Sequence, residues 1–335
     1  MKDIKQLMNE RILILDGAMG TMIQRYELDE DDFRKGWFED HPHKLKGDND
    51  LLVLTRPDII KEIHAQYLEA GADIIETNTF GGTTVAQADY HLEHAVYDIN
   101  YHGAKIAREV CDEFTAREPH KPRFVAGSMG PTTKLASMSP DVNDPGFRAI
   151  TFNELVVAFK EQATGLMDGG ADFLLVETIT DTLNSKAAMF AIDELSEERG
   201  IQIPIMISGT ITDQSGRTLT GQTTEAFLVS VSHMPLLSIG LNCALGADAM
   251  RPYLQVLSNQ APFAISAHPN AGLPNEFGQY DETPEMMGSQ IEEFLQEGLI
   301  NIIGGCCGTT PEHIRKMAEI AAKYSPRKIS ETTNA

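Results

Sequence analysis

Residues 172–178 read Asp172-Phe173-Leu174-Leu175-Val176-Glu177-Thr178, an apolar run closed by an acid and a hydroxyl residue. The run does not alternate apolar with polar residues, which is typical of a strand buried on both faces of a parallel sheet. Further apolar runs of this kind recur along the chain, at residues 12–17, 72–77, 123–128, 203–209, 236–243, 262–267 and 299–305.

Segments with helical spacing of apolar residues separate these runs. They cover residues 57–70, 96–114, 152–168, 183–198, 224–232, 247–257, 284–296 and 311–324. A regular alternation of about eight strands with eight helices favours a (β/α)₈ TIM barrel over a doubly wound sheet, which usually has fewer strands and a Gly-rich first turn. We therefore expect an α/β protein with one barrel over residues 1–324.

The longest irregular stretches follow the first, third, fifth and seventh predicted strands. They span residues 27–50, 129–147, 210–223 and 268–283. In a barrel these loops gather at the C-terminal face of the strands, where such folds carry their chemistry. Residues 325–335 lose apolar periodicity and are expected to be a linker or a cut end toward a following module.

Composition excludes several classes of function. The chain has 335 residues with 27 Lys+Arg against 49 Asp+Glu, a net charge of −22, so we expect neither nucleic-acid nor membrane-surface binding. The apolar runs are far shorter than the roughly 20 residues that a membrane-spanning helix requires. The four cysteines form no disulfide framework, and the first residues are charged, so a reducing, cytoplasmic location is expected.

Three cysteines end predicted strands. Cys243 closes the sixth strand, and Cys306 and Cys307 close the eighth, so all three should meet at one rim. Three thiolates favour a zinc site with one position open for water, a weak ligand or substrate. Two alternatives are a vicinal disulfide and plain burial of small apolar side chains. A third is a phosphate cradle formed by Gly304-Gly305, as the last loops of such barrels often provide.

Acids also end strands. Asp16 closes the first strand and Glu177 the fourth, and either carboxylate alone could simply cap the next helix. Two of them on a rim with three thiols suggest recognition of a ligand amino group, while the backbone N–H groups of Gly17 and Ala18 could take a carboxylate.

Two polar residues follow the seventh strand. Asn270 is a candidate for a weak, displaceable fourth zinc ligand, and His268 is either a ligand or a hydrogen-bonded structural residue. The remaining cysteine, Cys111, lies in a helical pattern and is expected to serve packing.

Several motifs resemble the homocysteine S-methyltransferase family. They are Leu15-Asp16-Gly17-Ala18-Met19-Gly20-Thr21, Glu76-Thr77-Asn78-Thr79-Phe80, Gly240-Leu241-Asn242-Cys243 and Gly304-Gly305-Cys306-Cys307-Gly308. Segments 139–145, 207–213 and 268–274 make the pattern most similar to the N-terminal homocysteine-binding modules of cobalamin-dependent methionine synthases. The resemblance implies a barrel in which Cys243, Cys306 and Cys307 hold zinc and Asp16 and Glu177 help to hold homocysteine.

In such modules, zinc-bound homocysteine receives a methyl group from methylcobalamin carried elsewhere, which implies folate and cobalamin modules as partners. The cobalamin-ligating Asp-x-His-x-x-Gly pattern is absent, because His94 stands where Gly is required after Asp89 and His91. Two other functions remain open at this point. One is a stand-alone methyltransferase using betaine or S-methylmethionine, and the other is a noncatalytic zinc- or thiol-binding scaffold.

Overall fold

The computed structural model describes residues 3–213, 215–243 and 246–329 and contains one eight-stranded parallel sheet. The order β1-β8-β7-β6-β5-β4-β3-β2 places β1 and β2 at its two ends, and a parallel bridge between Leu15 and Ile74 joins them into a nearly closed barrel. The strands are β1 (Leu13–Ile14), β2 (Ile74–Glu76), β3 (Phe124–Met129), β4 (Phe173–Ile179), β5 (Ile205–Gly209), β6 (Ser238–Asn242), β7 (Ala264–His268) and β8 (Ile302–Ile303). The predicted (β/α)₈ barrel is confirmed.

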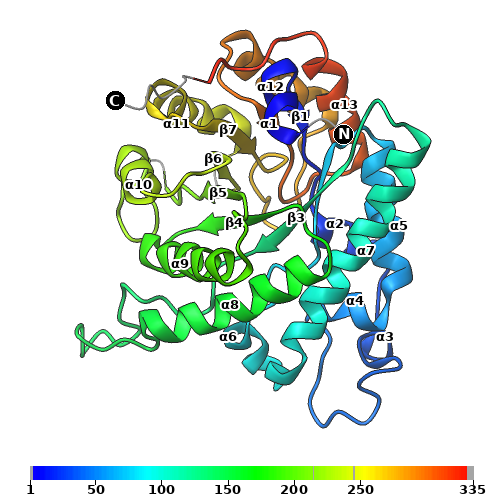
Figure 1. Ribbon diagram of the computed structural model, residues 1–335, viewed down its shortest axis with the longest axis vertical. Coiled ribbons are helices and arrows are strands. Elements are labelled where there is room, and N and C mark those ends of the chain that lie inside the picture. Colours follow the sequence, from blue (N-terminus) through cyan, green and yellow to red (C-terminus); the bar gives the residue numbers. More distant parts are fainter. Residues whose placement is uncertain (1–2, 214, 244–245, 330–335) are drawn as a thin grey trace.

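One main helix follows each strand and lies on the outside of the barrel (Figure 1). These helices are α5 (Pro57–Glu69), α7 (Val96–Arg117), α8 (Phe152–Asp168), α9 (Thr182–Arg199), α10 (Thr224–Val231), α11 (Gly246–Gln260), α12 (Pro284–Gln296) and α13 (Pro311–Ala321). Capping residues fix several of their starts. The hydroxyl of Thr151 accepts a hydrogen bond from the backbone N–H of Glu154, and the Glu154 carboxylate accepts one from the backbone N–H of Thr151, a reciprocal cap at the start of α8.

Apolar side chains fill the barrel on both sides of the sheet. An inner cluster includes Leu13, Ile74, Phe124, Phe173 and Met206, and α1 (Ile4–Glu10) adds side chains to it. A larger cluster lies between the sheet and the surrounding helices. Burial on both faces explains why the strands carry continuous apolar runs instead of an alternating pattern.

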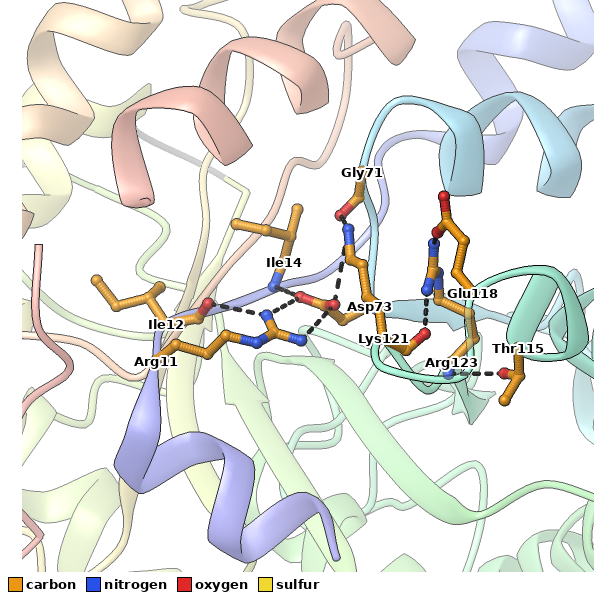
Figure 2. A network of polar contacts seen from close by, with 9 residues as sticks. All are labelled: Arg11, Ile12, Ile14, Gly71, Asp73, Thr115, Glu118, Lys121 and Arg123. Atoms are coloured by element: carbon orange, nitrogen blue, oxygen red, sulfur yellow. Dashed lines mark hydrogen bonds and ion pairs between the residues drawn. The ribbon is translucent and has the colours of Figure 1, made fainter. Parts of the chain in front are cut away.

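The N-terminal end of the barrel is fastened by ion pairs around Asp73 (Figure 2). Arg11 donates from both terminal guanidinium nitrogens to the Asp73 carboxylate, at 2.7 and 2.8 Å, and the Ile14 backbone N–H donates at 2.9 Å. Lys121 Nζ lies 3.8 Å from the same carboxylate and donates to the Gly71 carbonyl at 2.7 Å. Each oxygen of this buried acid is therefore matched by donors.

Two segments are more ordered than their sequences suggest. The first long loop, predicted to be irregular, contains α3 (Glu30–Arg34) and a 3₁₀ turn. Three more short helices lie between β1 and α7, namely α2 (Met19–Gln24), α4 (Leu52–Thr55) and α6 (Thr84–Gln87). In the segment predicted as a linker, Arg327 is buried and donates to the carbonyls of Ser258, Ala261 and Phe263. Residues 330–335 lie outside the described residues.

The long loop between β3 and α8 projects beyond the N-terminal end of α8 (Figure 1). Among the described residues, no helix is long and apolar enough to cross a membrane.

Candidate metal and substrate site

Polar residues form the upper layer of the barrel interior, at the C-terminal ends of the strands. Side chains alternate along a strand, so a residue two positions after an inward-facing one points to the same side. Glu76 follows inward-facing Ile74 in this way, and Glu177 follows Leu175. The mouth of the barrel is therefore polar above an apolar floor.

The three cysteines predicted to share one rim do meet there. The sulfur atoms of Cys243, Cys306 and Cys307 all lie within 4.8 Å of one another. Backbone hydrogen bonds hold their segments to the end of β7, from Cys243 N–H to the His268 carbonyl at 3.0 Å and from Cys306 N–H to the Pro269 carbonyl at 2.9 Å. All four cysteines are free, so the vicinal disulfide considered above is not formed. Cys111 is buried in α7, as expected.

The three thiols share negative charge unevenly. Hydrogen bonds from Cys243 and Cys306 lower the pKa of Cys307 to about 3, and Tyr280 adds to this effect. At Cys243 the bond with Cys306 lowers the pKa, but the bond to Cys307 and burial outweigh it and raise the pKa to about 12. A cluster that already stabilises one thiolate is suited to a soft divalent cation, which would remove the remaining protons.

Unmatched polar atoms beside the cysteines support a ligand at this place. Asn270 and His268 are 4% and 3% exposed, and neither Asn270 Oδ1 nor His268 Nε2 has a hydrogen-bond partner in the described part of the chain. Buried polar atoms normally have hydrogen-bond partners, so the two atoms without one are suited to contact a bound group. The donor set fits zinc, since thiolates and a carboxamide oxygen could complete four ligands. Burial lowers the pKa of His268 to about 3, so its ring is neutral.

The two predicted carboxylates also reach the mouth of the barrel. Asp16 Oδ2 accepts the Glu76 backbone N–H at 3.0 Å, while Asp16 Oδ1 is buried with no partner among the described residues. Glu177 Oε1 accepts the Ser128 hydroxyl at 2.5 Å. Burial, with the charge of Glu177, raises the pKa of Asp16. Burial, with the charge of Cys307, raises the pKa of Glu177 to about 7.

A backbone irregularity aims Glu177 and Cys243. Thr178 and Cys243 both have positive φ, 54° and 59°, which is rare outside glycine and is found where structure is strained for function. The Asn242 side chain stabilises Thr178 by accepting its N–H at 3.0 Å and donating to its hydroxyl at 2.8 Å. Asn242 is thus a positioning residue that links the carboxylate strand to the cysteine strand.

The backbone around Gly304 and Gly305 does not form a phosphate cradle. The N–H of Gly304 donates to the Ala267 carbonyl and that of Gly305 to the Asp16 carbonyl, both at 3.0 Å. Because these donors are already used, the phosphate alternative is wrong. Gly305 instead permits close packing, since a Cβ there would lie 2.4 Å from the Thr309 hydroxyl.

The predicted backbone donors near the first strand differ from each other. Ala18 N–H already donates to the Thr309 hydroxyl at 3.1 Å. Gly17 N–H donates to no described residue, so it is the better placed of the two for a ligand carboxylate. A Cβ on Gly17 would lie 2.7 Å from the same hydroxyl, which explains glycine at this position.

The family model described as homocysteine S-methyltransferase matches residues 13–321. The chain belongs to the homocysteine S-methyltransferase family. Solved structures agree in fold. The metallated homocysteine methyltransferase MmuM from Escherichia coli has a TM-score of 0.71 at 22% identity, covering 94% of this chain and 98% of that chain. Its apo form gives 0.66 at 20% identity, covering 93% and 96%.

Membership of the homocysteine S-methyltransferase family supports a methyltransferase, and the three-cysteine cluster could bind a metal.

The sequence alone did not assign a role to Glu76, Asn242 or Tyr280. Alternation along the second strand could have identified Glu76, since it lies two residues after Ile74. Tyr280 lies in a loop, and no local pattern indicates its contact with Cys307.

Proposed function

We propose that this chain binds zinc through Cys243, Cys306 and Cys307, activates homocysteine as a thiolate and methylates it to methionine. The observation that carries the proposal is a cluster of three thiols in the same barrel mouth as carboxylates that form no ion pair with a described residue. A thiol and an amino group on one small molecule match these two features. Family membership supports the same reaction.

The residues suggest how homocysteine would lie. Its sulfur faces the cysteines, where bound zinc would supply a positive charge that keeps the thiol deprotonated at neutral pH. Its ammonium group lies against Asp16 and Glu177, and its carboxylate faces Gly17 N–H, with Asn270 as the weak ligand that the substrate sulfur displaces. These contacts fix the orientation of the sulfur toward the open side of the barrel.

We further propose that the methyl group comes from methylcobalamin carried by another module. Apolar side chains on the loops after β2, β3 and β7 are exposed at this end of the barrel, including Phe80 at 43%, Phe147 at 48% and Phe277 at 78%. Exposed apolar surface of this kind is typical of a binding face for a large partner. A small donor such as betaine or S-methylmethionine would call for an enclosed pocket. Folate and cobalamin modules are therefore the expected partners.

Donor choice is tested by incubating zinc-loaded protein and homocysteine with free methylcobalamin, betaine or S-methylmethionine and measuring methionine. We expect slow formation from methylcobalamin that rises without early saturation, because a free donor lacks the roughly millimolar effective concentration of a tethered one. Saturable turnover with betaine or S-methylmethionine would establish the stand-alone enzyme instead. Homocysteine binding with no turnover on any donor would favour a noncatalytic scaffold.

The metal is tested with the Cys306→Ala variant and Cys111→Ala as the matched control. Cys306→Ala should lose tight zinc binding, while Cys111→Ala should keep one zinc per chain. Calorimetry in buffers of different ionisation enthalpy should show about one proton released as homocysteine binds the zinc protein. Full zinc content in Cys306→Ala, or the same proton release without metal, would contradict the proposal.

A further inference from the structure

We infer that Glu76 is a third acceptor for the substrate ammonium group, completing a set of three carboxylates with Asp16 and Glu177. The inference rests on the proposed function, because it concerns how the amino end of homocysteine is held. It adds a specificity-determining residue at the end of β2 to the acids at the ends of β1 and β4.

The placement of Glu76 comes from the barrel itself. Ile74 belongs to the inner apolar cluster, so Glu76, two residues later on β2, points into the barrel mouth. The backbone N–H of Glu76 donates to Asp16 Oδ2 at 3.0 Å, which fixes the two residues side by side. The charges of Glu177 and Asp16 both act on Glu76 and, together with burial, raise its pKa. The three acids therefore share one electrostatic environment.

No cation of the described part of the chain forms an ion pair with any of these three carboxylates. No described residue donates a hydrogen bond to the Glu76 side chain, and Asp16 Oδ1 is buried without a partner among the described residues. Glu177 uses Oε1 for the Ser128 hydroxyl. Three neighbouring acids without a counter-charge are costly, and a bound cation would relieve that cost.

A primary ammonium group matches this arrangement chemically. It carries three N–H donors, so three carboxylates from three strands can each accept one. The same negative charge repels a carboxylate, which directs the acid end of the substrate toward the Gly17 side. The set therefore selects α-amino thiols over thiols that lack the amino group.

The test combines a change in the protein with a change in the ligand. Binding of homocysteine and of 4-mercaptobutanoate, the same thiol acid without the amino group, is measured by calorimetry on zinc-loaded wild type, Glu76→Gln and Glu161→Gln. Glu161 is a half-buried acid on α8 whose pKa is also raised by burial, so it controls for loss of a partly buried charge. We expect Glu76→Gln to weaken homocysteine about tenfold and 4-mercaptobutanoate less than twofold, with Glu161→Gln changing neither.

Equal losses for both ligands in Glu76→Gln would assign Glu76 a structural role and overturn the inference, as would unchanged homocysteine affinity. If the proposed binding of homocysteine at this site is itself wrong, the result is different, because wild type would then bind neither thiol. Thermal unfolding of each variant verifies that affinity is compared between folded proteins.

Discussion

Asp73 and Asp16 occupy opposite ends of the same strand pair and have opposite surroundings. Asp73 precedes β2, its N–H donates to the Ile14 carbonyl, and its carboxylate is matched by Arg11 and Lys121 (Figure 2). Asp16 follows β1, its N–H donates to the Ile74 carbonyl, and one of its carboxylate oxygens has no partner in the described chain. The two acids are 0% and 2% exposed, so burial does not explain the difference.

The different surroundings of Asp73 and Asp16 suggest that acids at one end of the barrel serve stability and acids at the other end serve ligand binding. At the N-terminal end, charges are paired inside the protein, and removing one member leaves the others unsatisfied. At the C-terminal end, acids lie beside other acids, an arrangement that disfavours the empty protein and favours a cationic ligand. Two buried acids of one strand pair thus differ only in their partners, and on the proposed function this difference gives Asp73 a structural role and Asp16 a binding role.

The largest expected effect is on stability at the N-terminal end. Asp73→Asn removes a buried charge that accepts two hydrogen bonds from Arg11 and one from the Ile14 N–H, and it should lower the free energy of unfolding by about 3 kcal/mol, because hydrogen bonds to charged groups are the strongest in proteins. Urea denaturation measures this change. Homocysteine affinity of the folded variant should stay within twofold of wild type, and a large loss of affinity would show that the two ends are coupled.

Asp16→Asn should give the reverse result. It removes one charge from a crowded set, and Asn can still accept the Glu76 N–H, so the free energy of unfolding should be unchanged or higher. Homocysteine affinity should fall by about 2 kcal/mol, the usual cost of losing a hydrogen bond to a charged group. Isothermal calorimetry and urea denaturation of the same preparation measure both quantities. A clear loss of stability, or equal weakening of homocysteine and a thiol without an amino group, would place Asp16 with Asp73 among structural acids.

The smallest effect concerns Asp50, an acid in the first long loop. Burial and the neighbouring charge of Asp48 raise the pKa of Asp50 to about 8, well above its unfolded value near 4. A raised acid pKa stabilises the fold at low pH. This contribution is lost between the unfolded pKa near 4 and the folded pKa near 8, so Asp50→Asn should gain stability relative to wild type as the pH rises from 6 to 8.5.

Thermal or urea unfolding at both pH values tests this shift, and Asp58→Asn is a suitable control because Arg56 lowers the pKa of Asp58. A stability difference between Asp50→Asn and wild type that does not change with pH would contradict the assignment.

The sequence predicted those features that depend on local patterns of residues and on the order of the strands along the chain. Apolar runs indicated all eight strands, and strand order placed Cys243 on the same rim as Cys306, because every parallel strand ends at that face. Contacts between loops were not predictable in this way. The bond from Gly81 N–H to Asp50 joins the first loop to the second, and no spacing pattern reports it. The fold and the meeting of the cysteines could therefore be predicted from the sequence. The contacts between loops and the contact of Tyr280 with Cys307 could be found only in the folded structure.

The last strand closes both the barrel and the site. β8 pairs with β7 and β1, and Tyr67 on α5 donates its hydroxyl to the carbonyls of Ala18 and Thr309, fastening the first loop to the last. A nascent chain that has emerged from the ribosome only as far as β7 carries Cys243 without its two partners. At the proposed three-cysteine site, zinc capture during synthesis would wait for the final βα unit, and metal uptake would then mark completion of the barrel.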